Sequence, residues 1–241
     1  GALYGRDGKM EKAIEHLKKG YGPDKYDDHN HQYAEIAKIY ENNNDWKKAL
    51  EWRKKALEAY PDKVEYMDYL AWTYVKLNMD DEAAQLYLKV IEQTPDAKNR
   101  GAYMVLTARY YKNGNREKAY KYLLQGMKLN PNDYYFPFTL GRFHYLNKEY
   151  LQSEKYFMIA LSFKADDEFL LHALGTLYLV SDELSDRKKG KKYLLKVIEI
   201  NPDCLEAHQN LTKIFEEEQN DKKAEYHRER EREIKIKQLF R

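Results

Sequence analysis

The feature that most constrains this chain is an internal repeat of about 34 residues, visible as columns of similar side chains. One column holds only small residues, at spacings of 34, 36, 34, 37 and 34: Ala49, Ala83, Ala119, Ser153, Gly190 and Ala224. A second column holds mainly large rings: Tyr40, Tyr74, Tyr110, His144, Tyr178 and Phe215. A third is aliphatic: Ile36, Leu70, Leu106, Leu140, Leu174 and Leu211. Columns that agree in phase over six units predict a stack of one recurring structural unit.

Each unit reads as two helices separated by a turn. In the second unit, large and small apolar residues fall at i, i+3, i+4 and i+7, one stripe of a helix: Met67, Leu70, Ala71 and Tyr74. A second stripe follows from Ala83 to Ile91. Helix breakers separate the segments, as in Asn42–Asn44 and in the Asn-Pro pairs at 130–131 and 201–202. The pattern therefore predicts an all-α fold in which neighbouring helix pairs bury each other's apolar faces.

These columns resemble those of the tetratricopeptide repeat (TPR) family, whose unit is a helix–turn–helix of 34 residues. The resemblance implies a right-handed α-solenoid (superhelix) of stacked antiparallel helix pairs, arranged as a single array over residues 1–241. We expect repeats at 30–63, 64–97, 100–133, 134–167, 168–204 and 205–238, a partial repeat and linker at 1–29, and a capping helix at 222–241.

The two ends of the array lead to different expectations. Tyr4, Ala13 and Gly20 have the same spacing as Tyr40, Ala49 and Ala56, so we expect the first residues to be the later part of an incomplete repeat. Because the chain also begins without Met, we expect a trimmed N-terminus, in either a cytoplasmic or a periplasmic protein. The charged last helix is typical of a solvated cap. The alternative for this helix is a partner or coiled-coil surface through its apolar residues: Ile234, Ile236, Leu239 and Phe240.

In TPR proteins the first helix of each pair lines the concave groove where ligands usually bind, and the resemblance places aromatic residues there. The expected partner-binding residues are Tyr69, Trp72, Lys76, Met104, Tyr111, Lys112, Tyr135, Phe138, Arg142, Tyr145, Phe169 and His172. Tyr, Trp, Met and Arg are the residue types enriched at interfaces. The three cations Lys76, Lys112 and Arg142 could pair with acidic side chains or with a terminal carboxylate.

The pattern therefore favours a non-catalytic scaffold that binds a peptide or an amphipathic helix of a protein partner in an aromatic groove. Two other interpretations stay open for this lining. Tyr111 and Tyr145 could simply brace neighbouring helices, or the chain's own N-terminal segment could fill the groove. A different class of function is self-assembly, in which arrays form homo-oligomers through their repeat ends.

Other chemistries find little support in the sequence. The 42 basic and 40 acidic residues give a net charge of +2, too balanced for nucleic acid as the main partner. No apolar run approaches the roughly 18 residues that cross a bilayer, so we expect no membrane insertion. The single cysteine and the histidine spacing match no metal site, and we expect neither cofactors nor catalytic residues. The Lys, Asn and Arg columns of the chaperone-binding carboxylate clamp are also missing.

Overall fold

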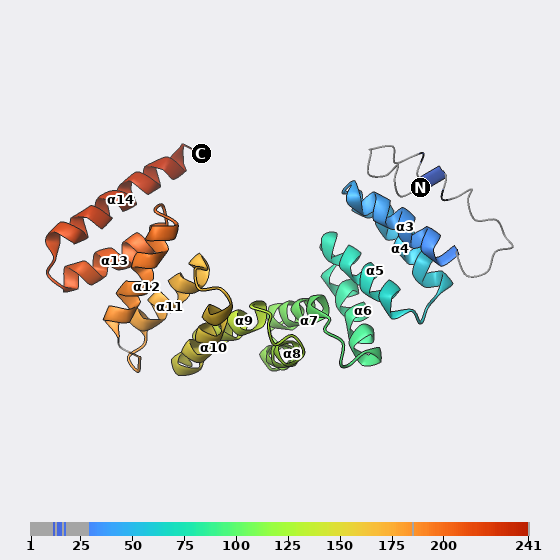
Figure 1. Ribbon diagram of the computed structural model, residues 1–241, viewed down its shortest axis with the longest axis horizontal. Coiled ribbons are helices and arrows are strands. Elements are labelled where there is room, and N and C mark those ends of the chain that lie inside the picture. The colour runs from blue at the N-terminus through green and yellow to red at the C-terminus, as the bar shows by residue number, and fades with distance from the viewer. Residues whose placement is uncertain (1–11, 13, 16, 18–28, 185, 241) are drawn as a thin grey trace. The chain divides into compact units, whose positions relative to one another are not determined.

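The computed structural model describes residues 29–184 and 186–240, together with 12, 14, 15 and 17, and divides the chain into two compact units. Unit 1 comprises residues 1–130 and unit 2 residues 131–241. The helices of unit 1 are α3 (His29–Asn42), α4 (Trp46–Ala59), α5 (Val64–Lys76), α6 (Asp80–Gln93), α7 (Arg100–Lys112) and α8 (Arg116–Leu129). The pairs α3–α4, α5–α6 and α7–α8 pack side by side, and each pair stacks on the next (Figure 1).

Unit 2 has the same construction. Its helices are α9 (Tyr135–Leu146), α10 (Tyr150–Phe163), α11 (Glu168–Val180), α12 (Arg187–Ile200), α13 (Leu205–Glu217) and α14 (Asp221–Leu239). Within this unit α10 stacks on α11, and α12 stacks on α13. The all-α prediction with antiparallel, TPR-like helix pairs is confirmed. None of the described helices combines the length and the apolar character needed to cross a membrane.

Turn residues end the helices where the sequence predicted breaks. Between the two helices of a pair, one residue adopts a positive φ: Asn44, Asn78, Gly114, Lys148 and Gln219. Asparagine and glycine tolerate this left-handed conformation better than other residues. The next helix then begins with a side-chain cap in several cases, such as Asn115, whose amide oxygen accepts a hydrogen bond from the Lys118 backbone N–H at 3.0 Å. Pro137 lies in the first turn of α9, where its missing backbone N–H breaks no hydrogen bond within the helix.

Small residues in the core let paired helices approach closely. A Cβ atom added at Gly141 of α9 would overlap the ring of Phe157 on α10. In the next pair, Gly175 of α11 and Gly190 of α12 meet almost backbone to backbone, and an added Cβ on Gly190 would lie 3.0 Å from the Gly175 carbonyl oxygen. The small-residue column therefore sets the distance between the two helices of a pair, and the large rings fill the space around it.

Residues 1–29 are described only in part. The predicted partial repeat with Tyr4, Ala13 and Gly20 lies outside the described residues, and the end proposed for self-assembly lies there too. The described Ile14 is buried in one apolar cluster with Ile36 and Ile39 of α3.

At the other end of the chain, α14 packs along α13 (Figure 1). Ile234 is buried rather than available to a partner. Ile236, Leu239 and Phe240 are exposed. Of the four apolar residues considered for a partner or coiled-coil surface on this helix, only these three are therefore accessible.

Candidate functional site

Helix α5 shows why aromatic side chains remain on the surface of a first helix. Its buried stripe is formed by Met67, Leu70 and Ala71. Tyr69 and Trp72 lie on the opposite side of the helix, because each residue advances about 100° around the axis. They keep 46 % and 44 % of their surface exposed. The core of this pair is thus complete without Tyr69 and Trp72, and their exposure is not a requirement of the fold.

A cleft of about 510 Å³ adjoins these two rings in unit 1. Its lining residues come from α3, α4, the turn after α4, and α5: Ala34, Glu35, Lys38, Glu41, Arg53, Lys63, Glu65, Tyr66, Tyr69 and Trp72. Three of these side chains are carboxylates and three are cations, so the formal charges of the cleft cancel.

An internal ion pair accounts for part of that cancellation. Arg53 is almost fully buried, and its Nε and Nη2 atoms donate to the two carboxylate oxygens of Glu41 at 2.9 and 3.0 Å. The same guanidinium lies 4.5 Å from the centre of the Tyr69 ring. The pair therefore packs against the Tyr69 ring. Because Arg53 and Glu41 neutralise each other, neither charge is available to a ligand.

Lys76 is also occupied within unit 1. Its Nζ lies 4.5 Å from the centre of the Trp72 ring and 5.7 Å from the centre of the Trp46 ring. A cation between two indole faces is held by their ring quadrupoles. Lys76 therefore does not line the cleft, and it orients Trp72 from one side.

Unit 2 contains a second cleft, of about 570 Å³, between α9 and α11. It is lined by Tyr134, Phe138, Arg142, Tyr145, Leu146, Asp167, Phe169, His172, Ala173 and Thr176. Five of these were predicted as binding residues, namely Phe138, Arg142, Tyr145, Phe169 and His172. The volume falls within the range of about 300–1,000 Å³ typical of ligand sites in proteins.

The aromatic rings of this cleft differ in how far they belong to the core. Phe138 stacks on Tyr134 with centroids 5.3 Å apart and also packs against the buried Phe157 at 6.1 Å. Tyr145 packs against Tyr150 of α10 at 6.0 Å. Phe169 leaves 75 % of its surface exposed. Phe138 and Tyr145 thus form walls that also brace the helices, whereas Phe169 is free to contact a ligand.

The polar groups of the second cleft are mostly held by the protein. Asp167 caps α11 by accepting a hydrogen bond from the Leu170 backbone N–H at 3.0 Å. Burial and a hydrogen bond to Asp167 raise the pKa of the Tyr134 hydroxyl, which therefore stays protonated. Burial lowers the pKa of His172 against the opposing pull of nearby carboxylates, and so favours its neutral form. Its Nε2 has no hydrogen-bond partner in the described part of the chain.

Five predicted binding residues lie in neither of these clefts: Lys76, Met104, Tyr111, Lys112 and Tyr135. Met104 is half-buried and Tyr111 exposed on α7. The Nζ of Lys112 lies 3.6 Å from Oδ2 of Asp80, so this cation is paired with the preceding helix pair. Tyr135 packs edge-on against Phe136 with centroids 5.3 Å apart.

The lining residues outside the first helices escaped the sequence reasoning: Arg53, Lys63, Tyr134 and Asp167. Arg53 belongs to a second helix, and the other three lie between helices, whereas the expected columns covered first helices alone. An aspartate immediately before a helix is a recognisable capping signal, and it could have directed attention to Asp167.

Reactive side chains form no obvious centre in the described residues. No three His, Cys, Asp or Glu side chains there are close enough to hold a metal ion. Burial raises the pKa of the Cys204 thiol, which disfavours the nucleophilic thiolate. His208 and His227 form a buried pair with 2.8 Å between their Nδ1 atoms, and the His208 Nε2 lies 3.0 Å from the Pro202 carbonyl oxygen. This pair joins α13 to α14 and has the character of a structural contact.

Sequence comparisons identify the repeat. Two descriptions of the tetratricopeptide repeat match this chain, one at residues 32–63 and 68–101 and the other at residues 110–133. A TPR repeat-containing protein of Pseudomonas aeruginosa is 26 % identical over 129 residues, which is 54 % of this chain and 21 % of that protein. The chain spans about a fifth of the length of the curated relatives it matches.

Solved structures show the same fold. The C-terminal part of a TPR repeat-containing protein from Cytophaga hutchinsonii superimposes with a TM-score of 0.73 at 18 % identity, covering 95 % of this chain and 92 % of that one. YrrB, described as a TPR protein with an unusual peptide-binding site, gives a TM-score of 0.60 at 22 % identity, covering 82 % of this chain and 95 % of that one.

Proposed function

Because this chain is a tetratricopeptide repeat protein, and such proteins are scaffolds for protein–protein interaction, we propose that it binds a peptide or an amphipathic helix of a partner protein at the aromatic clefts of its first helices. The proposal assigns no catalytic step to the chain. The peptide-binding site named for YrrB, a protein of similar fold, supports this class of ligand.

The observation that carries the proposal is the exposure of large rings beside both clefts. Tyr69, Trp72 and Phe169 keep between 44 % and 75 % of their surface in solvent, while other residues fill the helix core. Burial of apolar surface stabilises a complex by about 25 cal/mol per Å² before association costs are counted. Micromolar binding needs about 8 kcal/mol of net free energy, so two or three anchors worth about 2 kcal/mol each supply a large part of it and other contacts along the clefts supply the rest.

The test uses a phage-displayed library of random 12-residue peptides, selected on this immobilised 241-residue chain. Trp72→Ala probes unit 1 and Phe169→Ala probes unit 2, because both side chains are exposed and neither supports the core. Phe138→Ala is a poorer probe, since the loss of its contact with Phe157 would also destabilise the fold. We expect every selected peptide to lose at least about tenfold in affinity with one of the two variants.

A matched control is provided by Leu151→Ala and Ile200→Ala. These residues are 56 % and 45 % exposed and line neither of the two clefts. The control variants should change peptide affinity less than about twofold, and circular dichroism should show the same helix content in all of the proteins. Failure to select any peptide, or equal losses in the control variants, would refute binding at the aromatic clefts.

A further inference from the structure

The charges around the cleft of unit 2 identify the chemistry of its ligand. Resting on the function proposed above, we infer that this cleft takes a peptide segment in which a large apolar side chain lies within two residues of a carboxylate. The apolar side chain occupies the space between Phe138, Tyr145 and Phe169, and the carboxylate pairs with Arg142.

Arg142 differs from Lys112, another cation predicted to bind a partner. Arg142 lines the cleft and is exposed, and its guanidinium lies 5.9 Å from the centre of the Phe138 ring. In the described part of the chain no carboxylate lies within 4.0 Å of it, whereas Lys112 is paired with Asp80. A guanidinium over an aromatic ring remains able to bind a carboxylate through two parallel N–H groups.

The carboxylate of the same cleft is committed elsewhere. Asp167 accepts the backbone N–H of Leu170, lies 3.9 Å from the Lys164 ammonium, and also bonds to the hydroxyl of Tyr134. It therefore offers little attraction to a cationic ligand. The charge left unbalanced at the α9 side of the cleft is the positive charge of Arg142.

The α11 side has the opposite character. His172 experiences the fields of Glu168 and Glu206, and Glu168 accepts a hydrogen bond from the Asn201 side chain at 2.7 Å. A ligand carboxylate placed on this side would meet like charge, and the neutral His172 would not offset it. The two sides of the cleft thus fix an order for the ligand, with its acidic group at Arg142 and its apolar group deeper in the cleft.

The selection described for the proposed function provides the test, with attention to the sequences of the peptides. Among peptides that need Phe169, we expect most to carry Asp or Glu within two residues of Phe, Leu, Trp or Met. R142E should weaken these peptides at least about tenfold, and a new selection on R142E should favour Lys or Arg instead. R142K should retain part of the binding, because it keeps the charge and loses the bidentate geometry.

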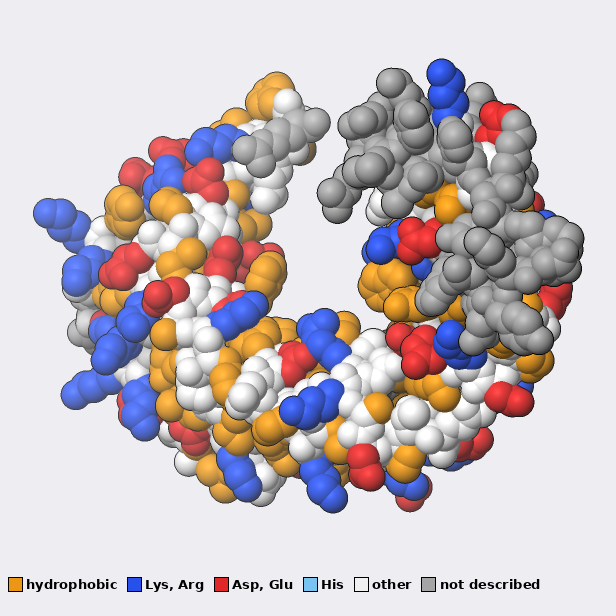
Figure 2. All heavy atoms as spheres, turned by 45° about the vertical axis from the view of Figure 1, so that its right-hand side comes forward, with side chains coloured by type: hydrophobic (Ala, Val, Ile, Leu, Met, Phe, Trp, Pro, Cys, Tyr) orange, Lys and Arg blue, Asp and Glu red, His pale blue; other side chains and the backbone are white. Residues whose placement is uncertain are grey.

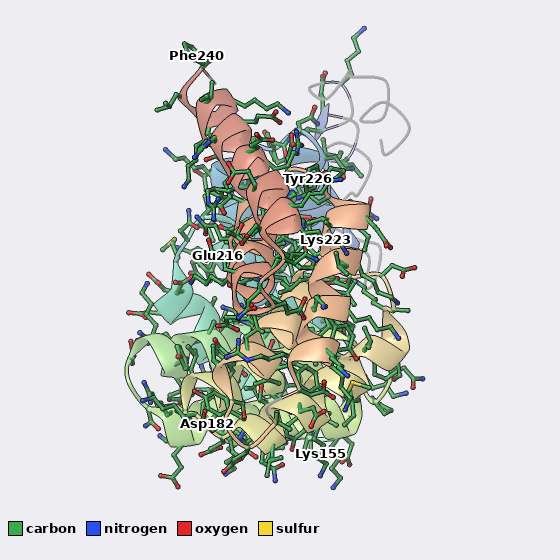
Figure 3. All side chains as sticks on the ribbon, turned by 90° about the vertical axis from the view of Figure 1, so that its left-hand side faces the viewer. Lys155, Asp182, Glu216, Lys223, Tyr226 and Phe240 are labelled. Carbon is green, nitrogen blue, oxygen red and sulfur yellow. The ribbon has the colours of Figure 1, made fainter. Side chains whose placement is uncertain are left out.

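The matched control is K155E, which makes the same charge reversal at an exposed residue of α10 outside the cleft (Figure 3). It should leave both the affinity and the selected sequences unchanged. A repeat of the measurement in about 0.5 M salt should weaken the acidic peptides on the wild-type chain and leave their residual binding to R142E nearly constant.

The outcomes separate the two proposals. If no peptide is selected at all, the proposed binding function fails and the inference fails with it. If peptides are selected that need Phe169 but show no acidic preference, or if R142E selects the same sequences as the wild type, the inference alone is overturned. Selection of peptides that depend only on Trp72 also overturns it, because the cleft of unit 2 would then bind none of them.

Discussion

In unit 1, Arg53 and Glu41 neutralise each other beneath the ring of Tyr69, whereas in unit 2 the described residues place no carboxylate within ion-pair distance of Arg142. The two clefts have similar volumes, about 510 and 570 Å³. Their difference therefore lies in electrostatic balance rather than in size. Basic and acidic side chains are interspersed on the face shown in Figure 2, so the pairing of individual charges decides which cleft can select a charged ligand.

The largest expected effect comes from removing the ring that supports the cleft of unit 2. Phe157 is buried, packs against Phe138 and fills the space over Gly141. Phe157→Ala should cost about 3–5 kcal/mol of the free energy of unfolding of unit 2, because it leaves a large cavity. Peptides that need Phe169 should then lose binding, and those that need Trp72 should keep it. Chemical denaturation followed by hydrogen exchange of each unit measures this, with the exposed Leu151→Ala as control. Equal destabilisation of both units would contradict the expectation that Phe157 stabilises unit 2 alone.

Acid should lower the stability of unit 2 more than that of unit 1. Burial, together with His208 and Lys223, lowers the pKa of His227 from 6.5 to about 4. Between these values the unfolded chain binds more protons than the folded one, so stability is complete above pH 6.5 and falls as the pH drops toward 4. The loss is at most about 3 kcal/mol.

Hydrogen exchange at pH 7 and pH 5 should show weakened protection of α13 and α14, while α5 and α6 change little. His227→Gln keeps a donor for His208 and removes the titration, so it should flatten this pH dependence. An unchanged pH profile in this variant would show that another group is responsible.

A smaller effect is expected from breaking the charge balance of unit 1. Arg53→Ala leaves Glu41 partly buried without its partner and should cost about 2–3 kcal/mol. Arg53→Ala combined with Glu41→Ala should recover part of that loss, because no unpaired charge remains. A thermodynamic cycle from urea denaturation gives the coupling energy. A coupling energy near zero would mean that the pair contributes neither to stability nor to the position of Tyr69.

The smallest expected effect concerns the cation held by two tryptophans. Lys76→Ala removes the contacts with Trp46 and Trp72 and should cost about 0.5–1 kcal/mol of stability. Lys76→Met keeps most of the side-chain length without the charge and should recover the packing part of the loss. Urea denaturation distinguishes the two variants. A loss larger than that of Arg53→Ala would mean that the order of importance assigned to these contacts is wrong.

The repeat columns predicted the fold class correctly because each column has one physical role. A small residue such as Ala83 sets a helix distance, and a large one such as Leu70 fills the adjoining space. The columns also indicated exposed rings such as Trp72 and Phe169. They could not indicate which charges are paired, because partners such as Lys112 and Asp80 belong to different helix pairs and meet only in three dimensions. Repeat periodicity therefore identifies a face, and side-chain geometry decides its chemistry.

The near contact between Gly175 and Gly190 has a consequence for the kinetics of association. Together with the Ser153 hydroxyl, which donates to the Gly141 carbonyl oxygen at 2.8 Å, it fixes both helix pairs that form the walls of the cleft in unit 2. A ligand therefore needs no separation of the two helices within either pair to reach the exposed ring of Phe169. We therefore expect on-rates in the ordinary range of about 10⁵–10⁷ M⁻¹s⁻¹, with differences between ligands appearing in their residence times.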